Sequence, residues 1–137
     1  MPPDVTLTTG PTAARAHLRG VEHLLAGRSR AAVGAFRESV IEDPCFAVGH
    51  ASLAVALATL DDDGRDEAVE VLASARRCSR HLSRRERHHV ELILLALQGR
   101  AGRASALGLE HLDEFPDDEV ARFVLERWCG TSAARSQ

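Results

Sequence analysis

The sequence predicts an all-α fold: a short right-handed α-α solenoid of three helix-turn-helix pairs, closed by a C-terminal capping helix. Three observations predict it. Apolar residues recur at helical spacing along most of the 137 residues. Gly27-Arg28, Gly64-Arg65 and Gly99-Arg100 interrupt this pattern at intervals of 37 and 35 residues, within the range of helix-pair repeats. The apolar residues are mainly Ala, Leu and Val, and Ala and Leu are among the strongest helix formers.

The first pair follows a proline-rich start. Three of the five prolines fall within residues 1–11, which we expect to form a flexible arm. Thr12 is a suitable N-cap for a first helix that ends near Gly27. A second helix is expected over residues 29–42, and Pro44 stops it because the residue before a proline avoids the helical region.

The second pair begins with an unusually apolar helix over residues 46–60. Apolar residues on nearly all of its sides predict burial between neighbouring helices. Residues 61–64 are expected to form a long turn, followed by a helix over 66–78. That helix is predicted to bury Ala68, Val69, Leu72 and Ala75.

The third pair opens with a capping box, in which Ser83 and Glu86 satisfy each other's free backbone amides. The helix is expected to run to residue 99, and its partner over residues 101–115 ends before Pro116. A seventh helix over 117–129 then covers the open side of the stack with its large side chains, Phe123 and Trp128. The helical domain therefore spans residues 12–129, and residues 130–137 are expected to be a flexible tail.

Composition restricts the classes of function. A net charge of −3 makes a nucleic-acid partner unlikely, because phosphate binding requires an excess of positive charge. No apolar run approaches the ~20 residues of a membrane span, and we expect no membrane partner. Residues 1–12 show no signal-peptide pattern. The three cysteines, Cys45, Cys78 and Cys129, lack any C-x-x-C spacing, so we expect reduced thiols and a cytoplasmic location.

The repeat pattern resembles the tetratricopeptide repeat. Counted back from Pro44, the first unit has residues of suitable size at Gly20, Ala32, Phe36 and Ser39. The second unit matches at Leu53, Ala54, Ala68, Leu72 and Ala75, but it has no closing proline. The third has Ala104 and Pro116, while Gly108 and His111 depart from the pattern. Residues 83–90 (SRRERHHV) followed by an alanine-leucine helix also resemble the tetratricopeptide repeat 38-like proteins.

This resemblance implies a groove lined by the first helix of each pair, which binds a helical or extended peptide segment or a second copy of the chain. By position, the partner-binding groove consists of His17, Val21, Leu24, Val48, Ala51, Val55, Ala58, His89, Ile93 and Ala96, with Val21, Val55 and Ile93 at its centre. Family members that clamp a C-terminal carboxylate use Lys, Arg and Asn there. This chain has no Lys and no Asn, so an amphipathic segment is the expected partner, and the chain is a non-catalytic adaptor.

No catalytic, cofactor-binding or metal-binding motif emerges from the sequence, and no cofactor is expected. His88 and His89 point about 100° apart on a helix, and neither forms an i, i+4 ligand pair with Glu91 or His81. Cys45 and His50 fall on different helix faces and lack a third orienting group. We therefore predict neither a metal site nor an enzyme.

A basic patch offers a second hypothesis. Its members are Arg76, Arg77, Arg80, Arg84, Arg85 and Arg87. Such a patch would bind nucleic acid or an acidic protein with an affinity that falls steeply with salt. The simpler interpretation is that these arginines pair with nearby acidic residues, including those of the sixth helix. An accessory subunit of an enzyme is the third hypothesis.

Overall fold

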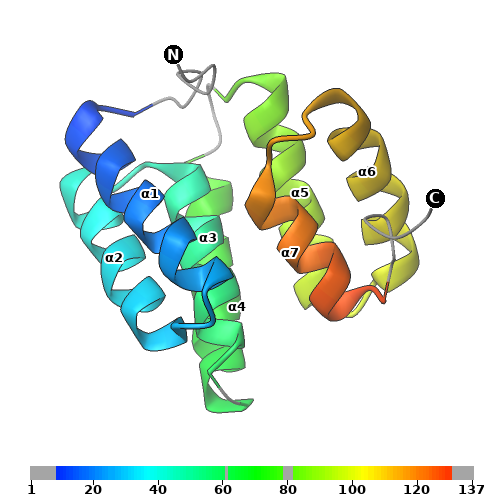
Figure 1. Cartoon of the computed structure of the whole chain (residues 1–137), viewed down its shortest axis with the longest axis horizontal. Coiled ribbons are helices and arrows are strands. Elements are labelled where there is room, and N and C mark those ends of the chain that lie inside the picture. Colours follow the sequence, from blue (N-terminus) through cyan, green and yellow to red (C-terminus); the bar gives the residue numbers. More distant parts are fainter. Residues whose placement is uncertain (1–8, 61, 79–81, 131–137) are drawn as a thin grey trace.

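The computed structural model describes residues 9–60, 62–78 and 82–130, and these form seven α-helices and no β-strand (Figure 1). The helices are α1 (Pro11–Leu25), α2 (Ser29–Glu42), α3 (Ala47–Ala58), α4 (Asp62–Arg77), α5 (Arg84–Leu97), α6 (Ala101–Glu114) and α7 (Glu119–Trp128). Consecutive helices pack as pairs, α1 with α2, α3 with α4 and α5 with α6, and α3 packs against α5 between the pairs. The all-α prediction is confirmed. A tetratricopeptide-like solenoid with a right-handed twist stays a prediction.

Two of the three predicted Gly-Arg hinges close helix pairs in the same way. Gly27 and Gly99 have φ angles of 81° and 83°, a left-handed conformation that glycine adopts without steric cost. The next amide returns to the preceding helix in each case: Arg28 N donates to His23 O at 2.8 Å, and Arg100 N donates to Leu95 O at 2.9 Å.

Gly64 is not a hinge, because α4 already begins at Asp62. The predicted turn over residues 61–64 is therefore shorter than expected, although residue 61 itself lies outside the described part.

Helix caps set two other boundaries. Gly10 rather than Thr12 is the N-cap of α1, and Pro11 occupies its first turn, where a missing amide proton costs nothing. The predicted capping box of α5 is confirmed, since Ser83 Oγ accepts from Glu86 N at 3.2 Å and Ser83 N donates to Glu86 Oε1 at 3.1 Å. Residues 1–8 of the expected arm and 131–137 of the expected tail lie outside the described residues.

The core centres on α3, which is buried along almost its whole length, with Val55 fully covered. Close packing of α1 on α2 depends on Gly20, because a methyl group there would collide with the ring of Phe36. Phe123 and Trp128 pack partly buried against the core. Val69 was expected to be buried, but its side chain is 55% exposed. No described helix is both long and apolar enough to cross a lipid bilayer.

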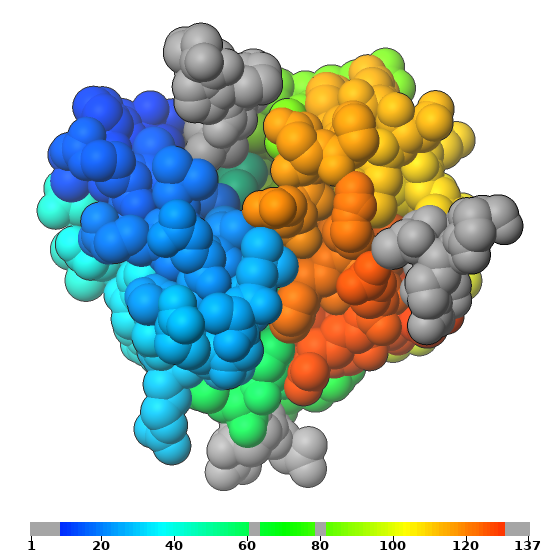
Figure 2. Space-filling model, viewed as in Figure 1, coloured from blue at the N-terminus to red at the C-terminus, as the bar shows by residue number. Residues whose placement is uncertain are grey.

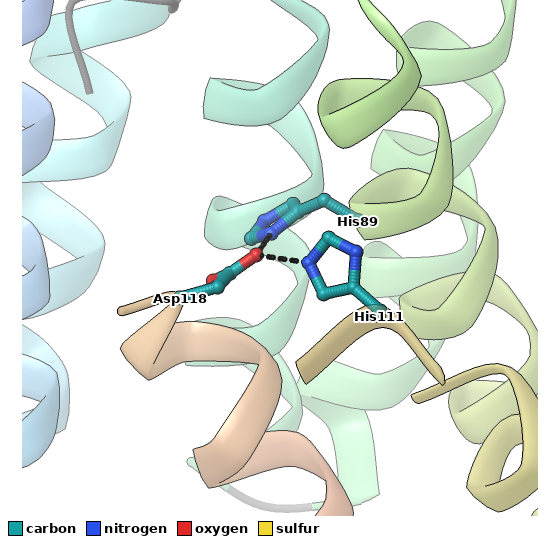
Figure 3. A group of neighbouring side chains, drawn as sticks. All are labelled: His89, His111 and Asp118. Atoms are coloured by element: carbon teal, nitrogen blue, oxygen red, sulfur yellow. Dashed lines mark hydrogen bonds and ion pairs between the residues drawn. The ribbon is translucent and has the colours of Figure 1, made fainter. Parts of the chain in front are cut away.

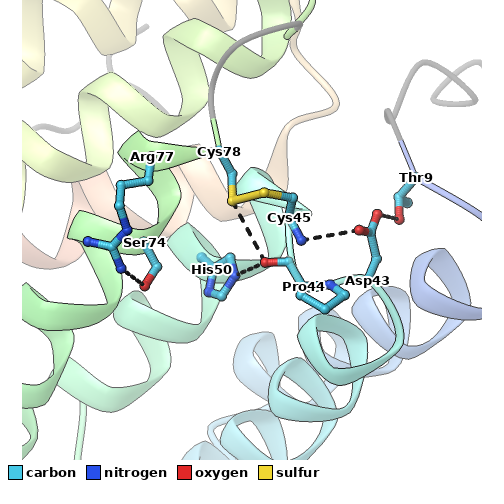
Figure 4. The surroundings of a disulfide bond; sticks show 8 residues. All are labelled: Thr9, Asp43, Pro44, Cys45, His50, Ser74, Arg77 and Cys78. Atoms are coloured by element: carbon cyan, nitrogen blue, oxygen red, sulfur yellow. Dashed lines mark hydrogen bonds between the residues drawn. A yellow bond between two sulfur atoms is a disulfide. The ribbon is translucent and has the colours of Figure 1, made fainter.

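A disulfide joins Cys45, in the turn between α2 and α3, to Cys78 at the end of α4 (Figure 4). The Cα atoms are 5.1 Å apart, although the residues are 33 positions apart in sequence. The expectation of three reduced thiols is therefore wrong for this pair, and only Cys129 is a free thiol. The spacing of the cysteines in the sequence did not indicate this bond, because it is the packing of α4 along α3 that brings Cys45 and Cys78 together. Disulfides persist mainly in oxidising compartments, so the cytoplasmic expectation loses the support it took from reduced thiols.

Candidate functional site

A cavity of about 670 Å³ opens between α1 and α7, with α3 and the start of α5 behind it. Figures 1 and 2 show α1 in blue on one side and the α6–α7 turn and α7 in orange on the other. We call this cavity the α1–α7 groove. Its apolar lining is Leu18, Val21, Leu25, Val48, Val120 and Phe123, and its polar lining is His17, Arg85, Glu86, His89, Asp117, Asp118, Glu119, Arg122 and Glu126, with Pro116 at the turn.

The two walls of the groove differ in chemistry. The α1 wall exposes large apolar side chains, with Leu18 at 52% and Leu25 at 45% exposed. The opposite wall is rich in carboxylates: Asp117, Glu119 and Glu126 are all exposed residues on or just before α7. An amphipathic ligand would therefore find an apolar wall on one side and an acidic wall on the other.

The two arginines that line the groove are already engaged. Arg85 forms an ion pair with Asp117, with Nη2 3.2 Å from Oδ1, and its guanidinium lies 5.3 Å from the ring centroid of Phe115. Arg122 Nη2 donates to the carbonyl of Pro116 at 2.7 Å. The ion pair neutralises Arg85, and the carboxylates of Glu119 and Glu126 outnumber the remaining cation of the α7 wall, Arg122.

The structure divides the predicted groove residues into two sets. His17, Val21, Val48 and His89 line the α1–α7 groove. The remaining side chains do not line it, and most of them lie in the core: Leu24, Ala51, Val55, Ala58, Ile93 and Ala96. Val55 and Ile93, expected at the centre of the groove, are 0% exposed. A ligand in the groove does not touch these two side chains.

At the back of the groove, three polar side chains from different segments converge (Figure 3). Asp118 Oδ2 lies 2.7 Å from His89 Nδ1 and 2.7 Å from His111 Nε2, so both imidazoles donate to one carboxylate oxygen. His89 lies on α5, His111 in the last turn of α6, and Asp118 caps α7. All three are buried, with exposures of 4%, 0% and 6% respectively. We call them the His-Asp-His cluster.

Asp118 has two tasks at once. Its Oδ1 accepts a hydrogen bond from the amide of Ala121 at 3.1 Å and caps α7, while Oδ2 accepts hydrogen bonds from the two histidines. Burial alone would raise the pKa of this carboxyl, but the charge of His89 and hydrogen bonds from both histidines and Ala121 outweigh it. They hold the pKa of Asp118 well below its usual value. The carboxyl is therefore ionised in the folded protein at neutral pH.

His17 is a second buried histidine at the groove. Its Nε2 lies 2.9 Å from Ser52 Oγ on α3, and its ring packs against Phe36 and Phe46 at centroid distances of 5.2 and 5.4 Å. Burial is the main reason that the pKa of His17 falls to about 3, and the charge of His89 lowers it further, against the opposing effect of Asp118. His17 is thus neutral at physiological pH.

The described arginines of the basic patch all have partners, and two of them form ion pairs. Arg84 pairs with Glu114 and Arg85 with Asp117, each at 3.2 Å. Arg77 donates to Ser74 Oγ and Arg87 to the carbonyl of Leu82. Arg76 is exposed and has a contact of its own, and Arg80 lies outside the described residues.

Sequence reasoning missed the His-Asp-His cluster because its members are 22 and 7 residues apart along the chain. A signal was nevertheless present. If α5 and α6 are antiparallel, the end of α6 lies beside the start of α5, and α7 begins at the same end. His89, His111 and Asp118 all fall at that end, and His111 occupies a position where the repeat pattern requires a small residue.

Comparisons with protein-family models, with curated proteins and with solved structures find no match to this chain. The resemblance to the tetratricopeptide repeat therefore stays a prediction. The function has to be inferred from the chemistry of the α1–α7 groove and of the cluster behind it.

Proposed function

We propose that this chain is a non-catalytic protein-interaction module, and that its α1–α7 groove binds an amphipathic segment of another protein. The segment would place apolar residues against α1 and basic residues against α7. The contrast between the two walls of the groove carries this proposal. Exposed Leu18 and Leu25 on one wall face a series of carboxylates on the other.

The apolar wall supplies affinity. Burying a fully exposed leucine side chain contributes about 1.5–3 kcal/mol, and Leu18 and Leu25, which are 52% and 45% exposed, would each contribute about half of that. Leu18 and Leu25 lie about two turns apart on α1, and Val21 lies between them, so the three side chains form one stripe on the helix. A partner helix with apolar residues at i, i+3 and i+7 matches that stripe.

The acidic wall supplies selectivity. Neither Glu119 nor Glu126 makes an ion pair with a described residue, and both are exposed. A lysine or arginine on the partner would pair with them, and an acidic partner would be repelled. Charge complementarity thus favours a basic amphipathic segment over an acidic one.

The proposal also covers the repeat architecture, the alternative occupant of the groove and the location of the protein. A tetratricopeptide-like stack of helix pairs would present the groove, and a second copy of the chain is the alternative occupant. The proposal includes a cytoplasmic location only if the chain folds without the Cys45–Cys78 disulfide, because disulfides persist mainly in oxidising compartments. Binding through the basic patch has less support, because Arg84 and Arg85 are already paired with Glu114 and Asp117.

Two synthetic helical peptides of equal length test this proposal. Both carry the same leucine stripe, and their polar faces carry either lysine or glutamate. We expect calorimetry to detect binding of the lysine peptide only, and light scattering without peptide to show a monomer. Leu25→Arg should abolish binding, whereas Ile41→Arg should not, because Ile41 is 74% exposed but lies outside the groove. Equal binding of both peptides, or equal loss in both variants, would contradict the proposal, and a stable dimer would favour a second copy as the occupant.

A further inference from the structure

We propose that His89, His111 and Asp118 form a binding site for a divalent transition-metal ion of the zinc type. Two imidazole nitrogens and one carboxylate oxygen would be its protein ligands, and the fourth position would face the α1–α7 groove. This site goes beyond the proposed peptide binding and does not depend on it.

The ligand chemistry fits such an ion. One potential ligand atom from each residue lies within 4.8 Å of the other two, and each comes from a different segment of the fold. Imidazole and carboxylate are common zinc ligands, and two histidines with one carboxylate and an open fourth position is a known catalytic zinc arrangement. The same set also suits iron(II).

The charge of the cluster is compatible with a bound cation. Asp118 is a buried carboxylate whose only ion-pair partners among the described residues are the two histidines. The amide of Ala121 and the N-terminus of α7 stabilise this negative charge in part, and a protonated histidine or a bound cation would balance it further. His89 Nε2 and His111 Nδ1 are buried and have no hydrogen-bond partner in the described part of the chain. An N–H at either atom lacks an acceptor on the protein both in a protonated ring and in a ring that binds a metal through its other nitrogen, so this cost does not distinguish the two states.

Coordination would require the two oxygen–nitrogen distances to lengthen and the nitrogen–nitrogen distance, now within 4.8 Å, to approach the same value. Ligand atoms about 2.0–2.1 Å from a tetrahedral zinc ion are about 3.3 Å from one another. The two oxygen–nitrogen distances, now 2.7 Å, would have to lengthen by about 0.6 Å to reach this value. Each ring would also release the proton on its coordinating nitrogen, either to its other nitrogen or to solvent.

Access comes from the groove. His89 and Asp118 both contribute to the groove lining, whereas His111 is fully buried behind them. An ion held by all three would thus have the protein on one side and the groove on the other. Water, or a side chain of a bound partner, would complete its coordination.

Titration of zinc chloride into chelator-treated protein without a histidine tag, followed by calorimetry, tests this site. We expect one zinc ion per chain. His111→Gln should weaken zinc affinity at least tenfold, because even the loss of a supporting residue costs about 10–100-fold. Asp118→Asn should also weaken it, and asparagine keeps the helix cap. His23→Gln, a histidine outside the cluster, should leave affinity unchanged. Absence of zinc binding in the wild-type protein, or equal affinity in the His111 and His23 variants, would overturn the proposal.

A measurement on the wild-type protein avoids any loss of folding in the variants. Imidazole nitrogen NMR signals of His89 and His111 should shift on addition of one equivalent of zinc, while those of His23 and His50 stay in place. Shifts confined to His23 and His50 would overturn the site. Because no peptide is present, this result does not depend on whether the groove binds a partner.

Discussion

Asp118 Oδ2 and His89 Nδ1, 2.7 Å apart, connect the N-cap of α7 to the second turn of α5. Because His111 donates to the same oxygen, a single carboxylate ties three helices together at the back of the groove. This contact fixes the position of α7, which carries the acidic wall. The geometry of the proposed binding surface therefore depends on a buried polar cluster.

Replacing Asp118 should be strongly destabilising. Asp118→Ala removes a helix cap and leaves two buried imidazole N–H groups without acceptors, so we expect a loss of about 3 kcal/mol in the free energy of unfolding. Asp117→Ala is the matched control, because Asp117 is exposed and its ion pair with Arg85 should contribute less than about 1 kcal/mol. Urea denaturation in the presence of a chelator measures both variants. Similar losses in the two variants would mean that the cluster does not stabilise the fold.

His17 should make the protein sensitive to mild acid. Its folded-state pKa of about 3 lies below its unfolded value of 6.5, so the unfolded chain binds a proton first as the pH falls. The stability that neutral His17 provides is complete above pH 6.5. It should decrease by about 1.4 kcal/mol per pH unit as the pH falls from there towards 3.

A His17→Gln variant isolates this effect, because it lacks the titrating group. The stability difference between wild type and variant should shrink by about 2 kcal/mol between pH 7 and pH 5. Urea denaturation at the two pH values measures it. A difference that does not change with pH would show that His17 titrates normally in the folded protein.

The disulfide predicts how many thiols of the denatured protein react before and after reduction. Protein purified without reductant and then denatured should expose one reactive thiol, Cys129, and three after reduction. Replacing both Cys45 and Cys78 by serine should lower stability by about 3–4 kcal/mol, since the bond closes a loop of 33 residues. Cys129→Ser serves as the control. Three reactive thiols before reduction would show that Cys45 and Cys78 are not joined in the purified protein.

Gly20 and Gly34 offer a matched pair for testing the packing of α1 against α2. Gly20→Ala should cost about 1–3 kcal/mol, because its methyl group meets the ring of Phe36. Gly34→Ala should stabilise α2 by about 0.5–1 kcal/mol, because nothing lies within 4 Å of the added methyl group. Thermal unfolding distinguishes the two directions. Stabilisation by both substitutions would contradict the close contact between α1 and α2.

The sequence predicted the helices well because their signals are local. Helical spacing of apolar residues, the Gly-Arg hinges at Gly27 and Gly99, and the Ser83–Glu86 box each act within a few residues of the position that they determine. The predicted hinge at Gly64 was wrong for a related reason. Glycine permits a left-handed turn but does not require one, and at Gly64 the chain continues as helix.

The candidate site was harder to predict because it depends on contacts between distant residues. The disulfide and the His-Asp-His cluster join residues that only the packing of helices brings together. Periodicity also could not separate groove from core. Val21 and Val55 both fall on inner helix faces, but α3 is enclosed on all sides whereas α1 lies at an edge of the stack.

The charge of the α7 wall tests the central claim most directly. In a Glu119→Lys, Glu126→Lys double variant, this wall becomes basic while the α1 stripe is untouched. We predict that calorimetry will show that the variant no longer binds the lysine peptide and now binds the glutamate peptide. Circular dichroism should show wild-type helicity. An unchanged preference for the lysine peptide in a folded double variant would show that peptide binding does not use the α1–α7 groove.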